Sequence, residues 1–519
     1  MLLVAVTMLP SCGGGSASPV AASGAAASAT SSLTADEARR IVEQAAAAAR
    51  AAGLPSTIAV TDAEANVLAV FRMDGARPTS RVAGDGGGLE GRVFGSDAVA
   101  ATKAASAALL SSGGNAFSTR TASFIVESHF PPGVDFTPGG PLFGVQLSSL
   151  PCGDVKRPGS PLGIGGDPGG VPLYRDGLVV GGLGVEADGV YGIDNDPASA
   201  PPEESVALAG AAGFDPPALV RASEILADGI RLPYANGAAA PAGGGAGSGT
   251  WLVLPRPPPP SSLVPATAGG VSGRVDPRFP TRGGAVLTAA EVAAVLDQAA
   301  GQSAKTRAAI RQPLGSSARV SIAVVDTTGA VLGFFQVGDA PNFGLDVSVQ
   351  KARTAAFFSS ESAGLELSRA GLGAYLASDV PLDGRYAYTS RAVGFLAQPF
   401  YPPGIGGAGF GPFSLPIEEW SPFDTGLQLD LLNLGGTGSC TAIARLPNGI
   451  TIFPGGIPLF KDGRLAGAIG VSGDGVDQDD LIAAAGGAAF EVPAEKRSDQ
   501  LVVRGTRLPW AKFPRHPEL

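Results

Sequence analysis

Two lysines and two glycine pairs recur at matching places in the two halves of the chain, and these residue types can bind a ligand. Lys103 and Lys351 lie in similar Ala-rich segments, where an ammonium group can pair with a ligand carboxylate. Gly169-Gly170 and Gly455-Gly456 lack side chains, so their backbone amides can approach a ligand closely. Two alternatives stay open, because lysine stems can lie along a packed helix and glycines can simply permit a turn. Neither pair has the spacing of a dinucleotide-binding or P-loop motif.

Acidic residues gather in two further segments, from Asp188 to Asp196 and from Asp474 to Asp480. Carboxylate oxygens suit Ca²⁺ and other hard cations, but neither segment has the residue order of an EF-hand loop. The alternative is that these carboxylates cap a helix, where they meet free amides and the positive end of the helix dipole. We expect capping rather than metal binding.

The composition excludes several kinds of chemistry. The chain has 36 Lys and Arg against 46 Asp and Glu, a formal charge of −10, so we expect no binding to nucleic acid or to an anionic membrane surface. Two His and three Cys are too few for a Cys/His zinc centre or a Ser-His-Asp triad in each half. Because no nucleophile is paired with a base and no metal triad occurs, no catalytic residue is predicted.

Four blocks of sequence occur twice in the same order, which indicates a tandem duplication. The pairs are Thr57–Phe71 with Ser321–Phe335, Val99–Ser112 with Val347–Ser360, Gly169–Val190 with Gly455–Val476, and Gly229–Tyr234 with Gly505–Trp510. In the third pair 12 of 22 positions are identical. The length of 519 residues also favours more than one domain.

Each copy is predicted to be an α+β domain with an antiparallel sheet, in the order helix, hairpin, helix, long insertion, hairpin, helix. Thr34 with Glu37, and Thr288 with Glu291, form capping boxes that begin the first helix of each copy. Asp176-Gly177 and its counterpart Asp462-Gly463 are two-residue hairpin turns. In the first copy we expect a helix from 35 to near 53, strands at 58–62 and 67–73, a helix at 99–110 and a hairpin spanning 173–185.

These patterns predict five parts of the chain, which are a tether at 1–32, a first domain at 33–236, a Gly/Pro-rich linker at 237–285, a second domain at 286–512 and a tail at 513–519. We expect the linker to be flexible where glycine dominates and semi-rigid where proline does. Its length allows the two copies to pair as an internal pseudo-dimer, and a homo-oligomer is the alternative.

The N-terminus resembles a bacterial lipoprotein signal. An apolar stretch from Met1 to Pro10 ends in Leu9-Pro-Ser-Cys12, which is similar to a lipobox, and a Gly/Ala/Ser-rich tether follows. No Lys or Arg precedes the apolar stretch, which departs from a signal peptide, and a chance Cys in a low-complexity tail is the alternative. We expect an exported protein, periplasmic or anchored in the outer membrane through a lipid on Cys12, and no membrane-spanning helix.

Cys152 and Cys440 lie one in each half, at similar distances before the two glycine pairs. In an oxidising compartment they can form a disulfide between the halves. Two buried free thiols are the alternative.

Three motifs of the second copy, which run from Ser321 to Leu332, from Lys351 to Ala356 and from Gly455 to Gly473, resemble the HbpS/GlcG family, the haem-binding or haem-degrading domain. The first copy is more diverged, but it keeps Phe71-Arg-Met-Asp74, which is similar to a motif that follows the family's second strand. The resemblance implies two tandem profilin-like domains, a tendency to oligomerise, and binding of haem or another small ligand in some members.

Both copies depart from this family by a long insertion, at about 117–167 and about 388–454. Phe130-Pro-Pro-Gly133 in the first insertion recurs as Tyr401-Pro-Pro-Gly404 in the second. The recurrence predicts ordered insertions that cover a pocket or the neighbouring copy.

If haem is the ligand, His129 is the candidate for holding its iron, because His, Cys, Met or Tyr usually does so. Gln398 stands at the corresponding place in the second copy, so a surface or loop-packing role for His129 is the alternative. We predict a lipoprotein that binds a small ligand, haem above all, through His129, the two lysines and the glycine pairs. The alternatives are an assembly module whose family pocket is filled by the insertions, and an enzyme acting on haem or on a small organic acid.

Overall fold

The computed structural model describes residues 32–84, 88–155, 160, 162–241, 245, 247–406, 408–416, 422–434 and 439–519. Cys12 and the rest of the expected signal and tether up to residue 31 lie outside the described residues. The chain from Ser32 to Leu519 forms one compact unit. Within the described residues, no helix combines the length and the apolar composition that crossing a bilayer requires.

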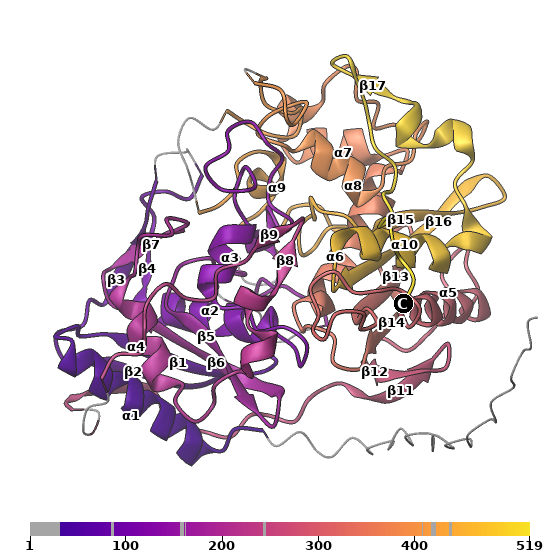
Figure 1. The fold of residues 1–519 in the computed structure, drawn as a ribbon. Coiled ribbons are helices and arrows are strands. Elements are labelled where there is room, and N and C mark those ends of the chain that lie inside the picture. The colour runs from indigo at the N-terminus through magenta and orange to yellow at the C-terminus, as the bar shows by residue number, and fades with distance from the viewer. Residues whose placement is uncertain are drawn as a thin grey trace, which may run out of the picture. The chain divides into compact units, whose positions relative to one another are not determined.

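The first half is organised around an antiparallel sheet with the strand order β10-β2-β1-β6-β5 (Figure 1). Its strands are β1 (Thr57–Asp62), β2 (Val67–Met73), β5 (Gly170–Arg175), β6 (Leu178–Glu186) and β10 (Gly249–Val253). The hairpin between β5 and β6 turns at Asp176 and Gly177, whose φ angles of +50° and +78° are those of a tight hairpin turn. The hairpin predicted from this Asp-Gly pair is therefore confirmed.

Three helices cover the two faces of this sheet. Helices α1 (Ala35–Ala51) and α4 (Pro202–Gly210) pack on the face that carries Ile58, while α2 (Ser96–Leu109) packs on the face that carries Ala59. The alternation of side chains along β1 makes both faces apolar, so both require a cover. Thr34 and Glu37 form the predicted capping box at the start of α1.

The second half repeats the same core. Its strands follow the order β11-β12-β14-β13-β16-β15, so β14-β13-β16-β15 corresponds to β2-β1-β6-β5 of the first half. The strands are β11 (Val264–Ala268), β12 (Val271–Val275), β13 (Val320–Val325), β14 (Val331–Val337), β15 (Gly456–Lys461) and β16 (Arg464–Gly473). Helices α5 (Ala289–Ser303) and α10 (Val476–Gly486) cover one face and α6 (Gly344–Phe358) covers the other. The predicted α+β class with antiparallel sheets is confirmed.

The described part of the segment 237–285 between the halves contains three strands, β10, β11 and β12, which were not predicted from the sequence. β10 adds an edge strand to the first sheet, where Trp251 packs on Phe71 with ring centroids 4.9 Å apart. β11 and β12 form a hairpin that extends the second sheet. Strand pairing and the packing of the half-buried indole offset the conformational entropy that these strands lose on ordering.

Shorter elements complete the described fold. Within or near the insertions lie α3 (Thr119–Ile125), α7 (Ala363–Arg369), α8 (Ser390–Leu396) and α9 (Leu427–Asp430). A small sheet of the first half contains β3 (Thr79–Val82), β4 (Val93–Gly95) and β7 (Val190–Tyr191). Two-stranded ribbons recur as β8 (Leu226–Ala227) with β9 (Ile230–Arg231), and β17 (Val502–Val503) with β18 (Thr506–Arg507).

The two insertions contact each other and the opposite half. Phe136 of the first meets Phe400 of the second edge to face at 5.1 Å, and the Gly404 amide donates to the Phe136 carbonyl. Gln428 of the second insertion donates to the carbonyl of Gly144 in the first, at 3.0 Å. The insertions are thus ordered in their described parts, and they join the two halves.

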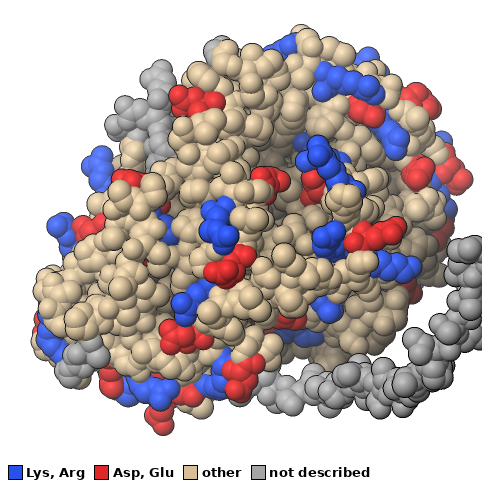
Figure 2. Space-filling view, viewed as in Figure 1, with Lys and Arg blue, Asp and Glu red and all other residues tan. Residues whose placement is uncertain are grey.

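Acidic and basic side chains are interspersed on the face of the molecule drawn in Figure 2. The picture shows no broad area of a single charge on that face. An extended anionic polymer therefore meets no continuous basic track there.

Candidate functional site

Lys103 on α2 is buried among three carboxylates of its own half. Its Nζ lies 3.0 Å from Asp167, 2.8 Å from Glu186 and 2.7 Å from Glu203. The same ammonium donates to the carbonyl of Val185 at 3.0 Å. Burial lowers the pKa of Lys103, but the carboxylates outweigh burial and hold that pKa well above its usual value. The expectation that Lys103 meets a ligand is corrected, because the protein's own acids already surround it.

This cluster contains more carboxylates than one ammonium can neutralise. Burial raises the pKa of Asp167 well above its usual range and raises the pKa of Glu203 to about 7, although Lys103 opposes both shifts. Ser80 donates to Glu186 at 2.6 Å. The group therefore retains a proton near neutral pH.

Two carboxylates of this cluster also belong, with Asp188, to a described group whose spacing suits a metal ion. One oxygen each from Glu186, Asp188 and Glu203 lie within 4.8 Å of one another. Two of these three residues contact Lys103, so the lysine already supplies the positive charge that they share. Asp188 instead accepts from the Val190 amide at 2.8 Å, which is a turn-capping role.

The acidic segment of the second half is also engaged with the protein. Asp474 accepts from Arg311 Nε at 2.6 Å and from the Arg319 amide at 2.9 Å. Asp479 pairs with Lys351, and Asp480 pairs with Arg391. The described acidic residues therefore hold cations and amides of the chain itself.

Lys351 on α6 is the counterpart of Lys103, but it has fewer acidic partners. It donates to Asp479 Oδ2 and to the Val471 carbonyl, both at 2.8 Å. Its Nζ lies 4.9 Å from the ring centroid of Phe453, which stands where the first half has Asp167. Burial lowers the pKa of Lys351, and Asp479 opposes the shift without reversing it. Lys351 also lines a small cavity, whereas Lys103 lines none of the described ones.

The glycine pairs serve packing, which corrects the prediction that they meet a ligand. The amides of Gly170 and Gly456 donate to Thr119 and Ser390 hydroxyls, both at 2.8 Å. A Cβ built on Gly170 would lie 2.5 Å from the carbonyl oxygen of Lys103, so only glycine lets α2 approach the sheet there. The turn-and-packing alternative fits the structure.

His129 is half-buried in the first insertion, and its Nδ1 lies 3.3 Å from the hydroxyl of its neighbour Ser128. It lines none of the cavities described here. The structure therefore brings His129 together with neither lysine and with neither glycine pair.

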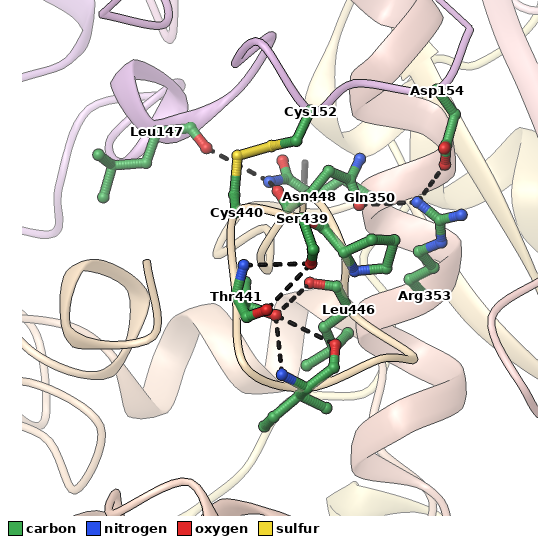
Figure 3. Close-up of a disulfide and its surroundings, with 12 residues drawn as sticks. Leu147, Cys152, Asp154, Gln350, Arg353, Ser439, Cys440, Thr441, Leu446 and Asn448 are labelled. Atoms are coloured by element: carbon green, nitrogen blue, oxygen red, sulfur yellow. Dashed lines mark hydrogen bonds and ion pairs between the residues drawn. A yellow bond between two sulfur atoms is a disulfide. The ribbon is translucent and has the colours of Figure 1, made fainter. Parts of the chain in front are cut away.

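Cys152 and Cys440 form a disulfide, with their Cα atoms 5.8 Å apart and a sequence separation of 288 (Figure 3). The bond joins the first insertion to the second. Beside it, the Gln350 side chain donates to the Leu147 carbonyl at 3.3 Å, which adds a contact between the halves, and to the Asn448 carbonyl of its own half at 2.7 Å. Two free thiols, the alternative, do not occur in this structure.

A cleft of about 710 Å³ opens in the first half, between α3, the end of α4 and the β8–β9 ribbon. Its size is in the range of small-molecule binding sites. Its walls carry both apolar and aromatic side chains and three arginines. The lining residues that matter for binding are Arg120, Phe124, Leu208, Arg221, Arg231, Leu232 and Tyr234.

The three arginines of this cleft differ in what holds them. Arg120 is buried, with Nε 2.7 Å from Glu204 and Nη2 3.2 Å from Asp194, so its charge is already paired. The Arg221 guanidinium lies 5.7 Å from the ring centroid of Tyr234, and its Nε has no hydrogen-bond partner. Arg231 is exposed and donates to a backbone carbonyl. Among the described residues, no carboxylate lies within ion-pair distance of Arg221 or Arg231.

The second half has the same arginines in a different setting. Arg497 lies 5.2 Å from the Trp510 ring centroid, as Arg221 does with Tyr234. Arg507, the counterpart of Arg231, lies 3.8 Å from the carboxylate of Asp499. Because the first half has Ser223 at the position of Asp499, its Arg231 keeps a charge that a ligand can neutralise.

This arrangement suits a flat, amphipathic anion. Two guanidinium groups without acidic partners can each hold a carboxylate through paired hydrogen bonds. Phe124, Leu208 and Leu232 offer apolar surface to the body of such a ligand.

This cleft was not predicted, although one signal of it is visible in the sequence. The duplicated block that ends in Tyr234 and Trp510 contains Arg-Leu-Pro-aromatic twice. The three arginines of the cleft have no motif spacing, because Arg120 comes from α3, Arg221 from a loop about a hundred residues later and Arg231 from β9. Only the fold brings them together.

Two segments of the chain, residues 33–83 and 427–488, match the family described as "Haem degrading protein HbpS-like". These segments lie one in each half and are similar to the HbpS-like family, as the motifs predicted. Among curated proteins, none matches the chain.

Solved structures resemble about a third of this chain and nearly the whole of their own. A complex of PduOC with haem is 19% identical, covering 36% of this chain and 96% of its own at a TM-score of 0.23. A double mutant of Streptomyces reticuli HbpS is 24% identical. The match covers 39% of this chain and 99% of the HbpS chain, with a TM-score of 0.23. The Klebsiella pneumoniae protein ORFY is 20% identical. The match covers 35% of this chain and 90% of the ORFY chain, with a TM-score of 0.22.

Proposed function

We propose that this protein binds a haem-type tetrapyrrole in the arginine-lined cleft. The observation that carries the proposal is the pair Arg221 and Arg231, which face the cleft without a carboxylate partner in the described part of the chain. A haem-type ligand is flat and apolar and carries two carboxylates, which matches two free guanidinium groups beside apolar walls. The similarity of two segments to a haem-degrading family supports this class of ligand.

The residues of the cleft fit the rim of a tetrapyrrole better than its iron. Of the side chains that usually hold haem iron, the described lining offers Tyr234 and no His, Cys or Met. Burial raises the pKa of Tyr234 above its usual value, so its phenol keeps the proton that a tyrosinate ligand must lose. Haem, when bound, would supply redox-active iron, while this chain's residues hold the carboxylates and cover the ring.

The test compares hemin with iron-free protoporphyrin IX in visible and fluorescence titrations. We expect similar dissociation constants for the two, because the arginines rather than an iron bond hold the ligand. Arg221→Gln and Arg231→Gln should each weaken binding roughly tenfold. Arg507→Gln is the matched control in the second half and should bind as the parent does.

Two results would contradict this proposal. Binding that is unchanged in both cleft variants would place the ligand elsewhere. A hemin spectrum that His129→Ala alters, while the cleft variants leave it unaltered, would restore His129 as the iron ligand.

A second proposal, that the chain is an assembly module, is favoured by the positions of the two Pro-Pro-Gly loops. Phe130 and Tyr401 are buried in the apolar clusters of their own halves, and the Tyr401 hydroxyl donates to the Val503 carbonyl at 3.1 Å. Hemin that causes no saturable spectral change, together with a stable homo-oligomer in light scattering, would support this function over ligand binding.

We further propose export and lipid anchoring through Cys12. The lipobox-like Leu9-Pro-Ser-Cys12 supports the proposal, as does a disulfide, since disulfides persist mainly in oxidising compartments. Full-length protein expressed in a bacterium should incorporate labelled palmitate, and Cys12→Ser should not. If the parent protein incorporates no labelled palmitate, the proposal of a lipid anchor on Cys12 is wrong.

A further inference from the structure

The two halves differ at one strand position next to the buried lysines. In the first half, Glu186 at the end of β6 reaches Lys103 Nζ at 2.8 Å. In the second half the equivalent position of β16 is Ser472, which pairs with Ser321 as Glu186 pairs with Thr57. Serine is shorter by three side-chain atoms, so the second half keeps the lysine and loses the acid that accompanies it.

A cavity of about 50 Å³ lies where that acid is missing. Lys351, Ser472 and Asp479 form its polar side. Its apolar side comes from both halves and includes Leu110, Phe117, Ile125, Leu232, Ile310 and Phe343. The volume suffices for roughly three water molecules, and therefore for an organic molecule of a few heavy atoms.

One polar atom on this cavity lacks a hydrogen-bond partner. Ser472 Oγ is buried and makes no hydrogen bond, although its hydroxyl can donate one, and the residue is 0% exposed. Native structures rarely leave such atoms unpaired, so an occupant with hydrogen-bonding groups is expected. The apolar opposite wall favours an occupant that also carries a small apolar part.

We propose that this cavity binds a small monocarboxylate of about acetate size, with its carboxylate beside Lys351 in the place that the Glu186 carboxylate has beside Lys103. Lys351 then has two carboxylates near it, fewer than the three that Lys103 holds. Ser472 donates its hydroxyl to the ligand, and the methyl group contacts the apolar wall. The cavity is far too small for a tetrapyrrole. Leu232 borders both spaces, but Lys351, Ser472 and Asp479 line the cavity and not the arginine-lined cleft.

The experiment titrates sodium acetate into the full chain by isothermal calorimetry at constant ionic strength. Ser472→Glu restores the residue that the first half uses and places a tethered carboxylate in the cavity. Lys351→Met removes the ammonium. Lys305→Met changes an exposed lysine and is the control for nonspecific anion binding. Circular dichroism establishes that each variant is folded.

We expect one saturable acetate per chain for the parent and for Lys305→Met, and binding weaker by roughly tenfold or more for Ser472→Glu. Lys351→Met should lose binding as well, and Ser472→Glu carries the test if that variant does not fold. Equal heats for the parent and Ser472→Glu, or no saturable heat for the parent, would overturn the proposal. Hemin titration of Ser472→Glu separates the sites, because the arginine-lined cleft should bind as before.

Discussion

Lys103 Nζ lies 2.7 Å from Glu203 Oε2, and Lys351 Nζ lies 2.8 Å from Asp479 Oδ2. Each half therefore contains its own copy of the same buried ion pair. The acid comes from the first turn of α4 in one half and of α10 in the other. The pair therefore ties the helix on one face of each sheet to the helix on the opposite face. Around this shared pair the first half has added two more carboxylates.

Replacing Lys103 should destabilise the protein more than replacing Lys351. Lys103→Met leaves three buried carboxylates without a cation, and removal of one partner from a buried ion pair typically costs about 3–5 kcal/mol. Lys351→Met leaves only one of the carboxylates that pair with this lysine, Asp479, without its cation. Urea unfolding of both variants measures the difference in the free energy of unfolding. Equal losses would mean that Asp167 and Glu186 do not depend on Lys103.

Stability should fall as the pH rises through the titration of Glu203. Its pKa is about 7 in the folded protein, against an ordinary value of 4.5, so the folded state binds the proton more tightly. Protonation of Glu203 contributes fully to the free energy of unfolding below pH 4.5, and this contribution is lost as the pH rises to about 7. Over that range the free energy of unfolding changes by at most about 1.4 kcal/mol per pH unit because of this residue.

Glu203→Gln isolates that contribution, because other buried acids such as Asp479 titrate in the same direction. The free energy of unfolding of Glu203→Gln should vary less between pH 4.5 and 7 than that of the parent. A pH profile that the substitution leaves unaltered would contradict the assignment to Glu203.

Loss of the disulfide should lower the thermal midpoint. A cross-link that closes a long loop typically contributes about 2–5 kcal/mol, chiefly by restricting the unfolded chain. Cys440→Ser should therefore melt earlier than the parent, and a reductant should lower the melting temperature of the parent without affecting the variant. Peptide mapping without reduction should recover Cys152 and Cys440 in one linked pair. Two unlinked peptides would refute the bond.

Glycine at position 182 should be essential for the packing of α2 on its sheet. A Cβ there would collide with the Ala104 carbonyl and approach the backbone of Ala108 to 3.2 Å. Gly182→Ala should therefore cost about 1–3 kcal/mol through overpacking. Gly373→Ala is the matched control, since no atom lies within 4 Å of a Cβ at that glycine. The two variants should differ clearly in thermal midpoint, and similar midpoints would argue against this packing.

The core elements were predictable because their signals are local. Both capping boxes lie within four residues of sequence, and each Asp-Gly turn fixes its hairpin without help from distant residues. The strand at Gly249–Val253 was not predicted, because glycine and proline around it dominate the local composition. Its order comes from Phe71, which lies far away in sequence and packs on Trp251.

The site residues were harder to predict for a related reason. Both lysines were singled out from their recurrence, but the acids that surround Lys103 come from three separate segments, at Asp167, Glu186 and Glu203. A single sequence does not show that these side chains converge. Arg231 lies in the duplicated Arg-Leu-Pro-aromatic block, but neither Arg231 nor Arg221 was predicted as a site residue, since their proposed role depends on the absence of a nearby acid.

The bond between Cys152 and Cys440 also has a consequence for proteolysis. Any cut in the chain between these two cysteines, for example between β10 and β11, opens a loop without releasing a fragment. Both halves would remain covalently attached until a reductant acts. A nicked form would therefore migrate at full mass on a non-reducing gel and as two pieces after reduction.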